Sequence, residues 1–143
     1  MAKGKVSPEL IEQFKQIVGE KYVYTDKDKL EPYSHDEVTD PHYMKEPQVV
    51  VLPATTEEVS KVVKLCYEND TVMVPRAAGT GLAAGAVATF GGVIISIERM
   101  NKILEIDKDN MVCVSEAGVT TSVLQEAVQK EGLFYGGDPC SGD

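Results

Sequence analysis

The segment 47–74 constrains the fold most, because a strand, a helix and a second strand follow one another in it without a break. The apolar run 48–52 is typical of a buried strand. Thr55 and Glu58 have the spacing of a capping box, which predicts a helix start. The residues behind this box that recur on one helical face are Val59, Val62, Val63 and Cys66. A further strand is expected at 71–74, and this order predicts a right-handed parallel crossover.

The rest of the chain adds a helix before this crossover and a hairpin after it. Ser7, Pro8 and Glu9 predict a helix start, and Gly19 predicts its end. Residues 20–46 are polar and lack a sustained period, so we expect a long ordered loop with short turns. The next elements expected are a strand at 92–97 and a hairpin formed by 103–106 and 111–115. A last helix is expected to start at Thr120 or Thr121 and to end at Gly132. Its inward-facing residues are expected to be Val123, Leu124, Ala127 and Val128. One crossover followed by a hairpin predicts an α+β fold rather than an open doubly wound sheet.

Composition narrows the class of protein. Apolar residues make up 43% of the chain and charged residues 26%, so a packed core is expected. The formal net charge of −9 argues against a nucleic-acid partner, because binding a phosphate backbone needs a basic surface. No run approaches the roughly 20 apolar residues that span a bilayer, and the first residues lack the apolar region of a signal peptide. The three cysteines follow neither metal-ligand nor disulfide spacing, which favours reduced thiols and a cytoplasmic location.

Glycine is concentrated in the second half of the chain, and the stretch 74–85 is the strongest candidate for a site. It reads V-P-R-A-A-G-T-G-L-A-A-G and directly follows a predicted strand. Glycine removes the Cβ that would keep a ligand away from the backbone, and successive N–H groups in one concavity bind an anion. The four alanines keep the walls low, Thr80 can donate from its hydroxyl, and Arg76 offers a charge whose direction the sequence does not give.

The spacing of these glycines excludes two common phosphate-binding motifs. It is G-x-G-x-x-x-G, which differs from the dinucleotide fingerprint G-x-G-x-x-G, and the next acidic residue is Glu98, after another strand. A P-loop is excluded because G-K-[ST] is missing. From the spacing alone, an anion site and a tight turn between two strands are equally compatible with the stretch.

Several motifs, taken together, resemble the FAD-linked oxidases of the glycolate oxidase/D-lactate dehydrogenase type. They are V-P-R-A-A-G-T-G-L at 74–82, G-G-V-I-I-S-I-E-R-M-N-K-I-L-E-I-D at 91–107, E-A-G-V-T at 116–120 and G-L-F-Y-G-G-D-P at 132–139. The run from Pro47 to Val59 resembles the family's entry strand and helix. The resemblance covers roughly residues 33–143, and the motifs occur in the family's order.

This resemblance implies a fold and a cofactor. The fold expected is α+β: a small parallel sheet with helices, followed by the start of a second, mixed subdomain, as in the vanillyl-alcohol oxidase class of flavin domain. Residues 1–46 would form an N-terminal helix and extended polar segment, and residues 47–143 the N-terminal part of an FAD-binding domain. The resemblance assigns FAD contacts to Pro75, Arg76, Ala77, Ala78, Gly79, Thr80, Gly81, Leu82, Gly118, Val119, Asp138 and Pro139. Some relatives attach flavin covalently to a histidine where this chain has Thr80, so non-covalent FAD is expected.

The activity implied is that of a D-2-hydroxy acid dehydrogenase acting on a lactate- or glycolate-like substrate, with an electron-transfer flavoprotein or a quinone as acceptor. We expect the chain to be a fragment of that enzyme, inactive alone and without catalytic acid–base residues of its own. A stand-alone nucleotide-binding or regulatory module without redox chemistry is the alternative.

Three other groups of residues have simpler interpretations. His35, Asp36, Asp40 and His42 could in principle hold a metal, but loop histidines beside aspartates are common without one, and no metal site is expected. The carboxylates of the region are expected to form a solvated acidic face; they are Asp26, Asp28, Asp36, Glu37 and Asp40. Cys66 and Cys113 are expected in the core, and a redox role for Cys140 has little support because no basic neighbour lowers its pKa.

Overall fold

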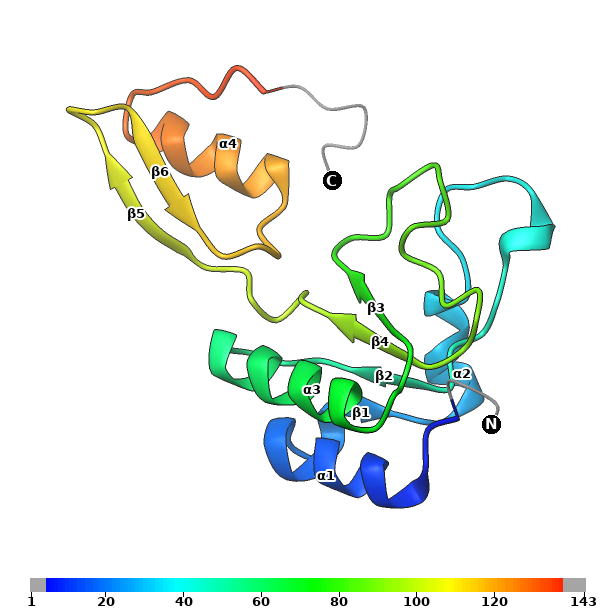
Figure 1. The fold of residues 1–143 in the computed structure, drawn as a ribbon. Helices are drawn as coiled ribbons and strands as arrows, with labels where there is room; N and C mark the ends of the chain where they lie inside the picture. The colour runs from blue at the N-terminus through cyan, green and yellow to red at the C-terminus, as the bar shows by residue number, and fades with distance from the viewer. Residues whose placement is uncertain (1–4, 138–143) are drawn as a thin grey trace. The chain divides into compact units, whose positions relative to one another are not determined.

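The computed structural model describes residues 5–137, which divide into two compact units, Met1–Arg99 and Met100–Asp143. Figure 1 shows the order of the elements along the chain. The first unit contains α1 (Pro8–Val18), β1 (Val23–Tyr24), α2 (Lys27–Leu30), β2 (Val49–Val51), α3 (Thr56–Glu68), β3 (Met73–Arg76) and β4 (Val93–Ser96). The second contains β5 (Ile103–Asp107), β6 (Val112–Ser115) and α4 (Thr121–Lys130). Helices and strands are thus mixed as the α+β prediction requires.

The sheet of the first unit has the strand order β1-β2-β4-β3. β4 lies between β2 and β3 and is parallel to both, so the two strands of the predicted crossover are not neighbours. β1 pairs antiparallel with β2, and this two-residue strand was not predicted. The sheet is therefore mixed, whereas the sequence predicted a small parallel sheet.

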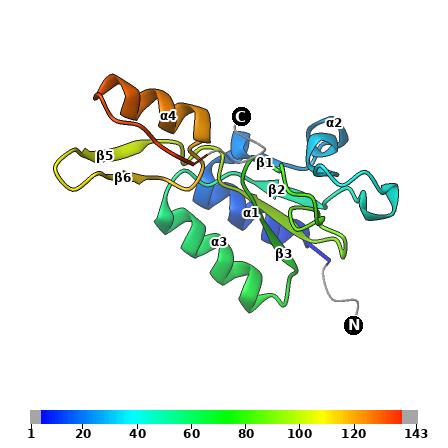
Figure 2. The ribbon, with the colours of Figure 1, turned by 90° about the horizontal axis from the view of Figure 1, so that it is seen from above.

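Both faces of this sheet are covered, which explains the continuous apolar run of β2. Val49 and Val51 pack with α1 and α3, whereas Val50 packs on the other face with Leu30 of α2. Figure 2, seen from above, shows α3 and α2 on opposite sides of the strands. All of β2 is buried, so the predicted buried strand is confirmed.

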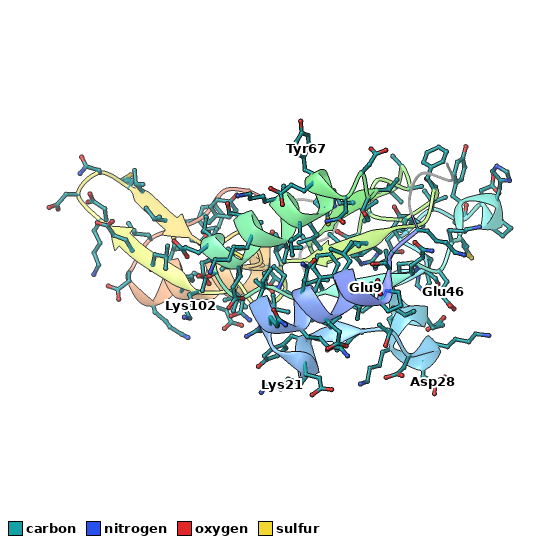
Figure 3. The ribbon with its side chains drawn as sticks, turned by 60° about the horizontal axis from the view of Figure 1, so that its bottom comes forward. Glu9, Lys21, Asp28, Glu46, Tyr67 and Lys102 are labelled. Carbon is teal, nitrogen blue, oxygen red and sulfur yellow. The ribbon has the colours of Figure 1, made fainter. Side chains whose placement is uncertain are left out.

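The helix boundaries follow from local capping. The Ser7 hydroxyl accepts from the Leu10 amide at 3.2 Å, and Gly19 ends α1 as predicted. Thr55 caps α3 by accepting from the Glu58 amide at 3.1 Å, but the Glu58 carboxylate reaches back to the Ala54 amide, one residue earlier than in a standard capping box. The buried side of α3 faces the sheet, whereas Tyr67 points away from it and is 81% exposed (Figure 3).

Residues 20–46 contain more structure than the predicted loop with short turns. Besides β1 and α2, three short 3₁₀ helices form, at Glu20–Tyr22, Glu31–Tyr33 and Pro41–Tyr43. Leu30 is buried against the sheet, so this polar segment supplies part of the core of the first unit. Tertiary packing fixes such short elements, and sequence periodicity does not reveal them.

The second unit consists of the β5–β6 hairpin and α4. The hairpin is antiparallel with an irregularity between Ile103 and Glu105, and Asp107 accepts from the Asn110 amide in its turn. Thr120 is the N-cap of α4, and Val128 is its buried residue. Val123 is 48% exposed, so the inward orientation predicted for it is wrong. Cys113 is half-buried rather than a core thiol.

No helix within residues 5–137 is long and apolar enough to cross a membrane.

Candidate cofactor-binding site

The candidate site begins where β3 ends. β3 extends through Arg76, two residues beyond the strand expected from the sequence, so Pro75 and Arg76 belong to the sheet and not to the loop. The segment that follows, residues 77–85, is called the glycine loop below. It leaves the carboxyl end of a strand in a parallel sheet, which is the edge where such sheets bind ligands.

The backbone of the glycine loop presents donors without partners. Within residues 5–137, none of the N–H groups of residues 77–83 donates to a backbone carbonyl. Gly79 has a φ of +76°, a conformation that L side chains rarely adopt, and Ala84 also has a positive φ of 55°. The loop is held to a neighbouring segment by the Glu37 amide, which donates to the Gly81 carbonyl at 3.1 Å. A run of free N–H groups around glycine is suited to an anion with several oxygens, such as a pyrophosphate.

The Arg76 side chain points inward beneath this loop, and Arg76 is only 8% exposed. Its Nη1 donates to the His35 carbonyl at 2.8 Å and to the Ala86 carbonyl at 3.3 Å, and its Nη2 donates to the Pro32 carbonyl at 3.3 Å. A Cβ built on Gly79 would overlap the guanidinium. Arg76 therefore supports the loop from below, which answers the question of direction that the sequence left open.

Aromatic and acidic groups surround the guanidinium. Its central carbon lies 5.5 Å from the centroid of the Tyr33 ring, and the Tyr33 hydroxyl donates to the Glu98 carboxylate at 2.8 Å. Burial raises the pKa of Tyr33, and the hydrogen bond to Glu98 raises it further. Burial also lowers the pKa of Arg76, an effect that the charges of Tyr33, Asp36 and Glu98 oppose. This cluster was not predicted, because Tyr33 and Glu98 are 65 residues apart in the chain.

Asp36 is the other buried charged residue beside the loop, with 6% of its surface exposed. Its Oδ1 accepts from the Val38 amide at 3.0 Å, whereas its buried Oδ2 has no hydrogen-bond partner among the described residues. That Oδ2 lies 3.8 Å from the position of a Cβ on Gly81. The expectation that Asp36 belongs to a solvated acidic face is therefore wrong. The burial of Asp36 has only a weak signal in the sequence, since Asp36 lies among other acidic residues in a polar segment.

The remaining predicted contact residues lie outside the first unit or outside the described residues. Gly118 and Val119 belong to the second unit, and their amides are already used: Gly118 donates to the Met100 carbonyl at 2.8 Å and Val119 to the Glu116 carbonyl at 3.3 Å. Asp138 and Pro139 lie outside the described residues.

The histidines and cysteines of the described residues have local or core environments. No group of three or more histidine, cysteine, aspartate or glutamate side chains within residues 5–137 is placed to hold a metal ion. Asp40 accepts from the His42 amide at 2.8 Å, which is a local turn interaction. Burial raises the pKa of the Cys66 thiol to about 11, so this thiol is a core group rather than a nucleophile. Cys140 lies outside the described range.

A glycine-rich loop with free amides at the carboxyl end of a parallel strand is an arrangement suited to a phosphate-containing cofactor. The fold is shared with alkyldihydroxyacetonephosphate synthase, with a TM-score of 0.84 and 24% identity; the match covers 99% of this chain and 28% of that one. The expected fold, that of a vanillyl-alcohol oxidase-class flavin domain, is confirmed.

The family model described as "FAD binding domain" matches residues 47–143, and the chain belongs to this family. Its cofactor is accordingly FAD. The chain is 44% identical to D-lactate dehydrogenase of Anaerostipes hadrus over 95% of its own length and 28% of that protein. It is 39% identical to glycolate oxidase subunit GlcD of Bacillus subtilis over 76% of its length and 23% of that protein. The chain thus spans about a quarter of the length of these two relatives.

Replacement of Gly79 by alanine tests the packing of the loop on Arg76. We expect Gly79→Ala to lower the free energy of unfolding by about 2 kcal/mol, because a Cβ meets a strained φ and the buried guanidinium. Urea denaturation measures the change. Gly85→Ala is the matched control, since a Cβ there meets open space and we expect a change within about 0.5 kcal/mol. Equal effects of the two substitutions would contradict the packing described for Gly79.

Proposed function

We propose that this chain forms the FAD-binding part of a flavin-dependent D-2-hydroxy acid dehydrogenase with a lactate- or glycolate-like substrate. The observation that carries the proposal is the run of amides at residues 77–83 that have no partner among the described residues and that follow the carboxyl end of a parallel strand. Membership in the FAD-binding family and the names of the two relatives support the choice of cofactor and substrate class. Because the chain spans about a quarter of those relatives, the activity is proposed for a protein that contains this chain.

In this proposal the amides of residues 77–83 bind the pyrophosphate of FAD, with Thr80 and the small side chains around it leaving room for the phosphate oxygens. Pro75 has no N–H and Arg76 is buried, so both contribute by fixing the start of the loop. Gly118 and Val119 would contact the cofactor through their carbonyls or by packing, since their amides are already bonded. Asp138 and Pro139 would lie near the ribityl chain or the ring.

When bound, FAD would supply the redox chemistry, as the acceptor at N5 of the hydride from C2 of the substrate; the hydroxyl proton would go to a base outside this chain, and the product would be a 2-oxo acid. The residues of this chain bind and orient the cofactor and contribute no acid–base group to that step. An electron-transfer flavoprotein or a quinone would reoxidise the flavin. A cytoplasmic location belongs to the same proposal and is supported by the cysteine spacing alone.

Flavin titration tests the loop assignment. The purified chain is expected to quench FAD fluorescence, and Gly81→Val is expected to raise the Kd at least about tenfold, because a β-branched side chain would restrict and crowd the backbone whose amides bind the phosphate. The control is Gly85→Val. Neither Cβ meets a described atom closer than 3.8 Å, so both variants are expected to fold. Binding of ADP without any response to FAD would favour the alternative, a nucleotide-binding module without redox chemistry.

Denaturation of the flavin-loaded protein tests the mode of attachment. The loop has Thr80 where some relatives have a flavin-linked histidine, and we expect all flavin to appear in the supernatant after acid precipitation. Absorbance and fluorescence of the two fractions provide the measurement. Flavin that stays with the precipitated chain would show a covalent link and overturn this part of the proposal.

Substrate reduction tests the activity on the protein that contains this chain. Anaerobic addition of D-lactate or glycolate is expected to bleach the visible flavin absorbance, whereas L-lactate, the matched control for D-lactate, is expected to leave it unchanged. The 143-residue chain alone, loaded with FAD, is expected to show no bleaching. A full-length protein that binds FAD but is reduced by neither acid would retain the cofactor assignment and lose the substrate class.

A further inference from the structure

A buried positive charge lies directly beneath the glycine loop. The Arg76 guanidinium donates to the carbonyls of Pro32, His35 and Ala86, and none of the ion pairs found within residues 5–137 includes it. Carbonyl oxygens satisfy its hydrogen bonds but do not neutralise its charge. A cation in this position is costly to bury unless an anion comes close to it.

The guanidinium packs directly against the backbone of the loop at Gly79. Gly79 packs so closely on the guanidinium that a Cβ would overlap Nη2, Cζ and Nε. Arg76 is 8% exposed, so an anion reaches its field across the loop and not by direct contact. An anion on the amides of residues 77–83 would therefore be bound by the N–H groups and attracted by a fixed charge behind them.

Asp36 places the opposite charge beneath the neighbouring glycine. Its Oδ1 is fixed by the Val38 amide, and its Oδ2, which has no partner among the described residues, lies 3.8 Å from the Cβ position of Gly81. The attraction between Asp36 and Arg76 acts to raise the pKa of the guanidinium, so the two charges lie within range of one another. An anion on the loop would be repelled by this carboxylate.

We propose that Arg76 and Asp36 are opposing positioning residues that set the anion affinity of the glycine loop through its backbone. Arg76 raises the affinity and Asp36 lowers it. The inference rests on the proposed binding of a pyrophosphate by residues 77–83. Because both groups are buried, their fields are weakly screened, and each acts more strongly than a surface charge at the same distance. Opposite signs for the two residues distinguish this role from a merely structural one, in which loss of either would weaken binding.

The decisive variant is Asp36→Asn in the full 143-residue chain. Asparagine keeps an oxygen for the Val38 amide and removes the charge, so we expect the Kd values of FAD and ADP to fall by about tenfold. Asp40→Asn is the matched control: Asp40 makes the same type of bond, to the His42 amide at 2.8 Å, but its residue is exposed. We expect that variant to bind both ligands with wild-type affinity, since solvent screens its charge.

The arginine is tested with a charge-conserving and a charge-removing substitution. Arg76→Lys is expected to stay within about threefold of the wild-type Kd for FAD, and Arg76→Gln to weaken binding by about tenfold or more. Circular dichroism and thermal unfolding establish whether each variant folds. If Arg76→Gln does not fold, the Asp36→Asn result decides alone, because its predicted sign is a gain in affinity.

The outcomes distinguish the assignment of the loop as the pyrophosphate site from the electrostatic roles of Arg76 and Asp36. Wild-type chain that binds neither FAD nor inorganic pyrophosphate overturns both the loop assignment and this inference. Wild-type chain that binds FAD while Asp36→Asn binds it equally or more weakly overturns the electrostatic roles and leaves the loop assignment standing. Tighter FAD and ADP binding by Asp36→Asn, with no change for Asp40→Asn, supports the inference.

Discussion

The hydrogen bonds that the Arg76 guanidinium donates are the interaction on which the organisation of the site depends. Its three acceptor carbonyls belong to Pro32, His35 and Ala86, so one side chain joins the end of β3 to the segment after α2 and to the far end of the glycine loop. Arginine suits this task because its donors diverge in one rigid plane. Without such a fixed centre, a glycine-rich loop would have many accessible conformations, and ordering it would carry a large entropic penalty.

The sheet supplies the rigid edge from which the glycine loop starts. β2, β4 and β3 run parallel, so their carboxyl ends share one edge, and α1 and α3 cover one face of them while α2 and Leu30 cover the other. A sheet covered on both faces is rigid, and its free edge is where chain segments can diverge without losing core contacts. The glycine loop begins at that edge. The polar segment 20–46, predicted from the sequence as an ordered loop with short turns, covers the second face with Leu30 and provides two of the three carbonyls that accept from Arg76, those of Pro32 and His35.

The parts of the fold that the sequence predicted are those set by local rules. The helices α1 and α3 begin and end at caps, and β2 and β4 are apolar throughout, so short windows suffice for them. The end of β3 was misplaced because Pro75 is typical of a strand boundary. However, β3 is an edge strand in the order β1-β2-β4-β3. A proline is tolerated in an edge strand when its nitrogen, which has no N–H to donate, lies on the side without a neighbouring strand. β1 and the burial of Asp36 depend on partners distant in sequence, and no window of the chain contains them.

For the glycine loop, too, the sequence indicated what local residue types determine, and the structure was needed for what depends on tertiary contacts. Glycines and alanines at 77–85 indicated a low-walled anion site, and family motifs indicated FAD, but neither could give the direction of the Arg76 side chain. The structure shows that the free amides of residues 77–83 and the buried guanidinium are two parts of one arrangement. The buried guanidinium loses hydration, whereas the amides of residues 77–83 belong to exposed or half-buried residues that water can reach. A pyrophosphate on the loop would accept from these amides and would bring negative charge close to the guanidinium. The buried positive charge therefore favours the binding of an anionic cofactor on this loop.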